Sequence, residues 1–215
     1  MTHTNHRYGT PEDLSNDYIV LIMPAKGINN QNAASKLRRL FDVLMAYEPI
    51  DAGGIDIGTL ISHSIEEIKA NISDSTPMIH GVYGDLETVT AVVDEVKAQG
   101  YGFSVVVSGL LDEVERAEKE HGIQRHSVEY ALGILGRKEL LPPPEIRKIT
   151  TMCGHGLISR YLVENVLEEL RRGKISLEEG AKKLGRNCVC GVFNLERAKV
   201  VLKEALEIGV SKGNG

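Results

Sequence analysis

The stretch Met78-Ile-His-Gly-Val-Tyr-Gly-Asp-Leu-Glu-Thr-Val-Thr-Ala-Val-Val-Asp-Glu-Val-Lys-Ala-Gln-Gly-Tyr-Gly-Phe-Ser-Val-Val-Val107 carries the clearest fold signal in this chain of 215 residues. Met78–Tyr83 predicts a strand, and Asp85 in the following turn predicts the N-cap of a helix over residues 86–98. The β-branched run at 103–107 predicts the next strand. Strands separated by a helix of this length indicate right-handed crossovers and a largely parallel sheet.

The same alternation of strands and helices extends on both sides of this stretch. The apolar run Tyr18–Met23 predicts a buried strand, residues 33–47 an amphipathic helix and residues 60–72 a second helix. Val128–Leu135 predicts a further strand. We therefore expect an α/β protein with a mostly parallel sheet built from βαβ units and a C-terminal helical segment that carries the cysteine loops.

Three segments follow from the composition along the chain. Residues 1–16 are polar and predict an extended arm, which contains His3 and His6. Residues 17–141 form the predicted α/β domain, and three prolines at 142–144 mark its end. Residues 145–215 are expected to be mostly helical and to dock back on the sheet. The alternative is that the whole chain forms one domain.

The overall composition is that of a soluble globular protein, with 42% hydrophobic and 26% charged residues and a net charge of −5. Nothing resembles the basic stripe that nucleic-acid binding requires, and the longest apolar run is too short for a membrane span. Three cysteines make an odd number in a chain too large to need a disulfide framework, which favours the reducing cytoplasm.

All three cysteines lie in two glycine-flanked motifs near the C-terminal end. The first is Thr-Met-Cys153-Gly-His155-Gly, and the second is Asn-Cys188-Val-Cys190-Gly. Glycine lets the backbone turn sharply, and each motif precedes a predicted helix whose N-terminus would stabilise a thiolate. We expect the three cysteines and His155 to form one site.

Four interpretations of this site stay open. An iron–sulfur cluster would be held by Cys153, Cys188 and Cys190, with His155 or a substrate at the fourth iron. A zinc ion would use the same three cysteines and His155 as four ligands. Without metal, Cys153 would be a catalytic nucleophile with His155 or another residue as its base. The simplest alternative is that these small thiols only pack the loops against the sheet.

A second set of candidate residues follows the predicted strands. Lys26, in Met23-Pro-Ala-Lys-Gly-Ile-Asn-Asn30, and Ser108 would contact an anionic ligand at one edge of a parallel sheet. If residues 150–152 also form a strand, Cys153 would join them there. Gly-x-Gly-x-x-Gly and the P-loop pattern are absent, so no nucleotide cofactor is expected.

The motif pair Thr-Met-Cys-Gly-His-Gly156 and Cys188-Val-Cys-Gly-Val-Phe-Asn194 resembles an uncharacterised prokaryotic protein family. The segments His6–Thr10, Lys26–Asn29 and Val106–Leu110 resemble the same family, so the resemblance covers most of the chain. It implies that these parts work as one unit, and it implies no particular reaction.

We therefore expect a cytoplasmic metal- or iron–sulfur-binding protein, and more specifically an enzyme that acts on a small polar or anionic metabolite. Lyase, hydro-lyase or sulfur-transfer chemistry would suit a metal with an open coordination position. The alternatives are a non-catalytic small-molecule sensor or metal carrier, and a metal-free enzyme with Cys153 as nucleophile. A small molecule is the expected ligand, and a homo-oligomer is a further expectation.

Overall fold

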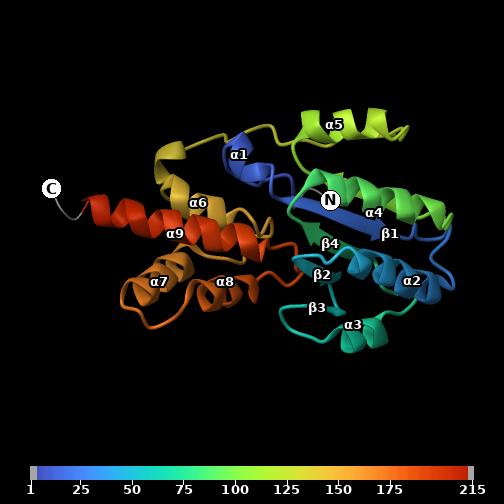
Figure 1. Cartoon of the computed structure of the whole chain (residues 1–215), viewed down its shortest axis with the longest axis horizontal. Coiled ribbons are helices and arrows are strands. Elements are labelled where there is room, and N and C mark those ends of the chain that lie inside the picture. Colours follow the sequence, from blue (N-terminus) through green and yellow to red (C-terminus); the bar gives the residue numbers. More distant parts are fainter. Residues whose placement is uncertain (1–3, 213–215) are drawn as a thin grey trace.

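The strands form one five-stranded sheet in which every neighbouring pair is antiparallel, in the order β3-β2-β4-β1-β5 (Figure 1). They are β1 (Tyr18–Met23), β2 (Asp51–Gly54), β3 (Gly58–Thr59), β4 (Ile79–Tyr83) and β5 (Ser104–Ser108). The structure is a computed structural model and describes residues 4–212. The chain is α/β as expected, but the prediction of a mostly parallel sheet is wrong.

That prediction failed because each crossover helix connects two strands that are not neighbours. β1 and β2, joined through α2 (Ala33–Ala46), run in the same direction, but β4 lies between them and is antiparallel to both. β4 and β5, joined through α4 (Leu86–Ala98), are also parallel, with β1 between them. With β3 and α3 set aside as additions between β2 and β4, this connectivity is βαββαβ, the split arrangement called ferredoxin-like. The helices correctly indicated strand direction and gave no information about adjacency.

Most helices begin where a capping side chain predicts. Asp85 accepts a hydrogen bond from the backbone N–H of Thr88 at the start of α4, as predicted, and Ser176 forms a capping box with Glu179. The remaining helices are α1 (Pro11–Leu14), α3 (Ile65–Asn71), α5 (Leu111–Glu120), α6 (Pro144–Thr150), α7 (Arg160–Arg171), α8 (Leu177–Gly185) and α9 (Leu195–Lys212), with a short 3-10 helix η2 (Lys138–Leu140). Among residues 4–212, no helix is long and apolar enough to cross a membrane.

Three predicted elements differ from the structure. Residues 128–135, predicted as a strand, have no regular secondary structure and are exposed. Residues 150–152, the other expected strand, are the last residue of α6 and the turn after it. The helix predicted over 60–72 begins only at Ile65, because the preceding residues form β3 and a turn.

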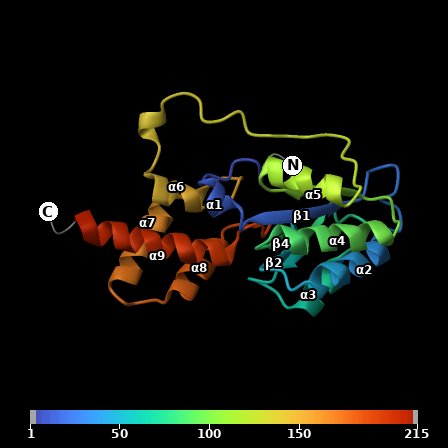
Figure 2. The same ribbon diagram turned by 45° about the horizontal axis from the view of Figure 1, so that its top comes forward.

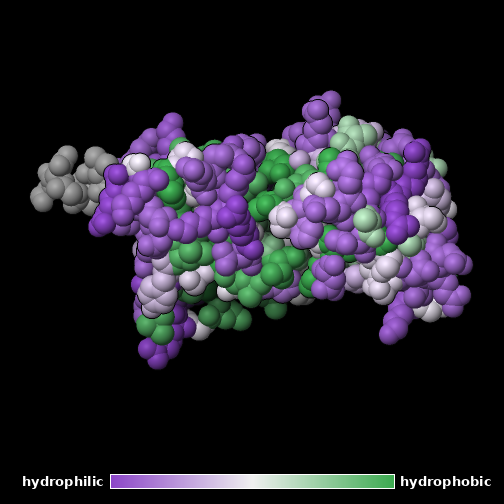
Figure 3. Space-filling model, turned by 90° about the horizontal axis from the view of Figure 1, so that it is seen from below, coloured by the Kyte–Doolittle hydropathy of each residue, from purple (hydrophilic) through white to green (hydrophobic). Residues whose placement is uncertain are grey.

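Two hydrophobic clusters use opposite faces of the sheet. Tyr18, Val20 and Ile22 of β1 pack in the cluster that contains α2 and α4, whereas Ile19 and Leu21 pack in the cluster that contains the C-terminal helices. Figure 1 shows α6 to α9 gathered at one end of the molecule and α2 to α5 at the other. On the face seen in Figure 3, apolar side chains gather in the middle, between these two halves. The cysteine motifs therefore belong to the core that joins the helices to the sheet.

The N-terminal arm lies against the C-terminal segment over its described part, residues 4–16. The backbone N–H of Tyr8 donates a hydrogen bond of 2.9 Å to Oγ1 of Thr151, and the Arg147 guanidinium lies 4.0 Å from the Tyr8 ring centroid. His6 is exposed, and His3 lies outside the described residues. The arm is therefore a packed part of the fold and reaches the turn that carries Cys153.

Candidate functional site

The two cysteine loops meet in the core between the sheet and the C-terminal helices. Cys153 lies in the turn between α6 and α7, and Cys188 and Cys190 lie between α8 and α9. All three are buried free thiols in the cluster that contains Ile19 and Leu21 of β1. The fold thus brings together motifs that are separated by more than thirty residues in the sequence.

Pairwise contacts link the four residues predicted from the motifs in a chain from Cys153 through Cys188 and Cys190 to His155. The Sγ atoms of Cys188 and Cys190 are 3.8 Å apart, and Nδ1 of His155 lies 3.6 Å from Sγ of Cys190. Cys153 is hydrogen-bonded to Cys188. His155 is the exposed member of the group, and it precedes Gly156, whose φ of +69° favours glycine. The site is therefore a buried thiol cluster with an imidazole at its solvent side.

Hydrogen bonding separates the acidities of two of these thiols. The Cys188 thiol donates to Cys153, and together with the backbone N–H groups of Leu157 and His155 it lowers the pKa of Cys153 to about 6, against the effect of burial. The hydrogen bonds with Cys153 and Cys190, together with burial, raise the pKa of Cys188. The pair therefore loses its first proton at Cys153.

The sheet places two buried polar side chains beneath the cysteine loops. Asp51 of β2 accepts hydrogen bonds from the N–H groups of Ala52 (2.9 Å) and Leu60 (3.0 Å) with Oδ1, while its buried Oδ2 has no hydrogen-bond partner in the described residues. Burial raises the pKa of Asp51 to about 8, and the charge of Cys190 adds to this effect. His80 of β4 is fully buried and pairs in register with Leu21 and Gly53.

Gly191 holds the second cysteine loop against the sheet. Its φ is +70°, and a Cβ atom at this position would lie 2.3 Å from Cγ2 of Thr59 and 3.2 Å from Nε2 of His80. Only glycine combines this backbone conformation with so close an approach. The backbone directly after Cys190 therefore rests on β3 and β4.

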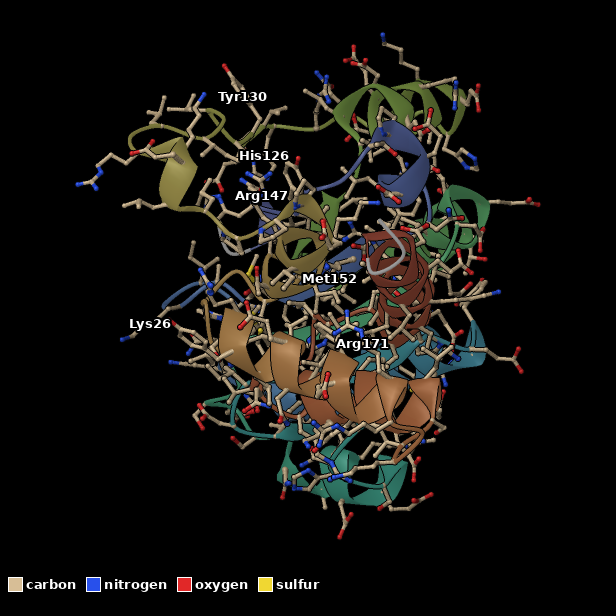
Figure 4. All side chains as sticks on the ribbon, turned by 90° about the vertical axis from the view of Figure 1, so that its left-hand side faces the viewer. Lys26, His126, Tyr130, Arg147, Met152 and Arg171 are labelled. Carbon is tan, nitrogen blue, oxygen red and sulfur yellow. The ribbon has the colours of Figure 1, made fainter. Side chains whose placement is uncertain are left out.

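The structure does not bring Lys26 and Ser108 to this site. Met23, at the end of β1, pairs with Ser104, whereas Ser108 pairs with Ile19 near the start of β1. Lys26 follows the end of β1, whereas Ser108 lies beside the start of that strand, so the two residues are at opposite ends of it. Figure 4 also shows Lys26 on the outer side of the molecule, well apart from Met152 beside the first cysteine. The shared anion site predicted for them depended on parallel strands and is wrong.

The predicted role of the helix N-termini also needs correction. α7 begins at Arg160 and α9 at Leu195, so neither Cys153 nor Cys190 lies in the first turn, where the helix dipole acts. Cys153 instead receives individual N–H groups from the turn that follows it. The glycines of the motif matter because they allow this turn.

Asp51 and His80 are the site residues that the sequence did not reveal. Asp51 begins a stretch that reads as a glycine-rich loop, and His80 stands inside an apolar run without a partner motif. Their position under the cysteines follows from the strand order, in which β2 and β4 are neighbours. No spacing in the sequence carries that information.

Within residues 4–212, no three or more His, Cys, Asp or Glu side chains already surround one point closely enough to hold a metal ion. Two surface hollows were found, one along α5 and one between α6, α7 and α9, and neither is lined by a cysteine.

The family resemblance of the cysteine motifs stays a prediction. Comparison with protein-family models, with curated proteins and with solved structures found no match to this chain.

Proposed function

We propose that this protein binds a single metal ion of the zinc type through Cys153, His155, Cys188 and Cys190. In a tetrahedral zinc site, with Zn–S of about 2.3 Å and Zn–N of about 2.0–2.1 Å, two sulfur ligands lie about 3.8 Å apart and a sulfur and a nitrogen about 3.6 Å apart. The distances between Cys188 and Cys190 and between Cys190 and His155 are 3.8 and 3.6 Å. Two of the ligand-to-ligand distances therefore already equal those of a tetrahedral zinc site. This agreement is the observation on which the proposal depends.

The same distances favour one ion over an iron–sulfur cluster. In a cubane cluster each cysteine binds a different iron, so the ligand sulfurs stand at separate corners of a large group. Sulfurs in van der Waals contact, as in Cys188 and Cys190, leave no room for such a group between them. An ion that both sulfurs share fits this spacing.

Ion binding has to draw the four side chains closer around one point. Cys153 is already hydrogen-bonded to Cys188, and His155 is exposed on a turn with glycine on both sides, so small side-chain movements close the set. Because His155 faces solvent, an ion enters and leaves past one ligand. This supports the metal-carrier alternative more than turnover of a small molecule.

The test is metal content together with the spectrum of the Co²⁺-substituted protein, prepared anaerobically under reducing conditions. We expect one ion per chain, with thiolate-to-cobalt charge-transfer bands and the visible bands of tetrahedral cobalt. Serine at Cys153, Cys188 or Cys190 should abolish these bands. His155→Asn should weaken Co²⁺ binding about tenfold or more, whereas His126→Asn, also exposed and hydrogen-bonded to its neighbour Ser127, should not.

Two outcomes contradict the proposal. Iron with stoichiometric sulfide would replace the single ion by a cluster on the same cysteines. A protein that binds neither Zn²⁺ nor Co²⁺ after reduction would remove metal binding altogether.

Thiol chemistry at Cys153 is a second candidate, favoured by the N–H groups of His155 and Leu157 that face its sulfur. Cys188 is a matched internal control because both side chains are buried, with 1% and 3% of their surface exposed. In metal-free protein at neutral pH, iodoacetamide should alkylate Cys153 faster than Cys188, as measured by peptide mass spectrometry. Equal rates would show that these donors give Cys153 no advantage.

A further inference from the structure

One outer strand of the sheet has a free side. β5 pairs with β1 on one side, and no described residue pairs with its other side. The chain after α5 crosses to η2 and α6 without adding another strand, as Figure 2 shows. All five residues of β5 stay partly exposed, whereas all five residues of β4 are buried. The residues of β5 therefore keep contact with solvent along the whole strand.

This free side lacks the features that normally keep sheet edges apart. Natural edge strands carry charged residues, prolines or bulges that prevent pairing with another chain. Residues 98–111, which contain β5, include no charged residue and no proline, in a chain in which 26% of the residues are charged. β3, the other outer strand, is only two residues long. Of the two edges of the sheet, β5 is therefore the one that accepts an added strand.

The sequence of β5 is complementary to itself. It is Ser104-Val-Val-Val-Ser108, which reads the same in both directions. An antiparallel pair of two β5 strands with its two-fold axis at Val106 places Ser104 of each copy opposite Ser108 of the other. Val105 then lies opposite Val107. Opposite side chains share one face of a sheet at about 4.5–5.5 Å, so serine meets serine and valine meets valine. A second copy of this chain thus matches the edge residue by residue.

The charges at the two ends of β5 are complementary as well. Nζ of Lys36 lies 5.9 Å from the ring centroids of Tyr101 and Phe103, just before β5. Just after β5, α5 begins with Asp112 and Glu113 in its first turn. Antiparallel pairing brings the start of one β5 beside the end of the other. Lys36 of each copy then approaches the acidic start of α5 in the second copy.

We propose that two copies of this chain form a dimer in which the β5 strands pair antiparallel and join the two sheets into one. Main-chain hydrogen bonds and the opposed valines stabilise the contact. The two-fold arrangement uses the open edge of both copies, and the short β3 at the far side offers no comparable edge, so the assembly closes at two chains. The inference does not depend on metal binding at the cysteines.

The first test is the molar mass of the purified full chain over a range of concentrations, by light scattering and sedimentation. We expect a monomer–dimer equilibrium that reaches a plateau at the dimer mass. Hydrogen exchange of the wild-type chain identifies the surface that is used, without any variant. The amides of β5 should exchange more slowly in the concentrated dimer than in the dilute monomer.

Two double variants at the same two positions test which residues lie opposite each other. Ser104→Lys/Ser108→Lys places lysine opposite lysine at both ends of the paired strands, and it should raise the dimer dissociation constant about tenfold or more. Ser104→Lys/Ser108→Glu is the matched control, because it places each lysine opposite a glutamate, and it should keep the dimer. Far-UV circular dichroism and the unfolding midpoint check that both variants fold.

Four results overturn the proposal. A chain that stays monomeric at all concentrations is the first, and growth beyond the dimer without a plateau is the second. The third is a dimer in which the amides of β5 exchange as fast as in the monomer, since another surface then forms the contact. The fourth is equal dissociation of the two folded double variants, which contradicts the pairing of Ser104 with Ser108.

Discussion

At the scale of single residues, the site depends on a carboxyl group that the sheet has buried. Asp51 has no exposed surface, and two backbone N–H groups bind only one of its oxygens. Its pKa is raised from 3.8 to about 8, chiefly by burial, so the folded protein keeps a proton that the unfolded chain loses at lower pH. A neutral acid here lets the buried oxygen act as a hydrogen-bond donor.

This shift predicts a pH dependence of stability with a definite sign. Between pH 4 and 8 the folded state holds one more proton at Asp51 than the unfolded state does, so the free energy of unfolding falls as the pH rises, by up to about 1.4 kcal/mol per pH unit. Asp51→Asn keeps the shape and cannot titrate. Urea unfolding of both metal-free proteins from pH 4.5 to 7.5 should therefore show the wild type losing stability relative to the variant as the pH rises.

The comparison isolates this carboxyl because every other group, including the thiol of Cys153, titrates in both proteins. The expected relative loss over the window is a few kcal/mol. Parallel stability curves would mean that Asp51 is ionised in the fold. A slope of opposite sign would mean that its charge is stabilised there.

At the scale of elements, the second cysteine loop is held against the sheet by the close approach of Gly191. Gly191→Ala adds a methyl group 2.3 Å from Cγ2 of Thr59 at a φ of +70°. Gly173→Ala, between α7 and α8, has nearly the same φ of +64° but nothing within 4 Å of the added atom. The two variants therefore separate the conformational cost from the steric cost.

We expect Gly173→Ala to lower the free energy of unfolding by about 1–2 kcal/mol, and Gly191→Ala to lower it by about 1–3 kcal/mol more. Gly191→Ala should also displace Cys188 and Cys190 and weaken Co²⁺ binding, which Gly173→Ala should leave unchanged. Chemical denaturation and cobalt titration measure both effects. Equal losses for the two variants would contradict the close packing of Gly191 on β3.

The elements themselves were predictable where local chemistry determines them. Asp85 and Ser176 mark helix starts because their side chains accept hydrogen bonds from the backbone three residues later. Such a cap depends only on residues that are close in the sequence. The order of strands is not local, since β4 lies between β1 and β2 and pairs with residues some sixty positions away in β1 and some thirty away in β2. The segment 128–135 has the period of a strand, yet in this chain it lies outside the sheet.

In the candidate site, too, local features could be predicted and features that depend on strand order could not. Cys153, His155, Cys188 and Cys190 could be predicted together because each pair lies in one short motif, and they do meet. Their proximity to Asp51 and His80 depends on which strands are neighbours, so no sequence motif predicts it. Lys26 and Ser108 were misplaced for the same reason, since an antiparallel sheet sends the loops after β1 and β5 to opposite ends.

At the scale of the whole molecule, a buried ion cluster joins the arm, the sheet and the last helix. The carboxylate of Asp17, just before β1, lies 3.0 Å from Nη1 of Arg7 and 2.9 Å from Nη1 of Arg197. Asn194, the N-cap of α9, donates to Asp17 Oδ1, and Arg197 donates to the carbonyl of Tyr8. The arm, the start of β1 and the distant start of α9 therefore share one carboxylate.

Loss of that carboxylate should loosen the whole molecule. The side chains of Asp17, Arg7 and Arg197 have 0%, 6% and 3% of their surface exposed, so Asp17→Ala leaves two buried guanidinium groups without the carboxylate that pairs with both. We expect a loss of about 3–5 kcal/mol in the free energy of unfolding. Burial already lowers the pKa of Arg197 despite Asp17, which indicates how costly its isolated charge would be.

The matched control is an ion pair at the surface. Asp42 lies 2.6 Å from Nζ of Lys69, with 45% and 34% of their side-chain surface exposed, so Asp42→Ala should cost no more than about 1 kcal/mol. Denaturant unfolding compares the two variants, and hydrogen exchange shows where protection is lost. Because Asp17 connects three segments, its loss should release the amides of the arm and of the start of α9 together. Similar losses for both variants, or exchange confined to the arm, would mean that the cluster does not hold the two halves to each other.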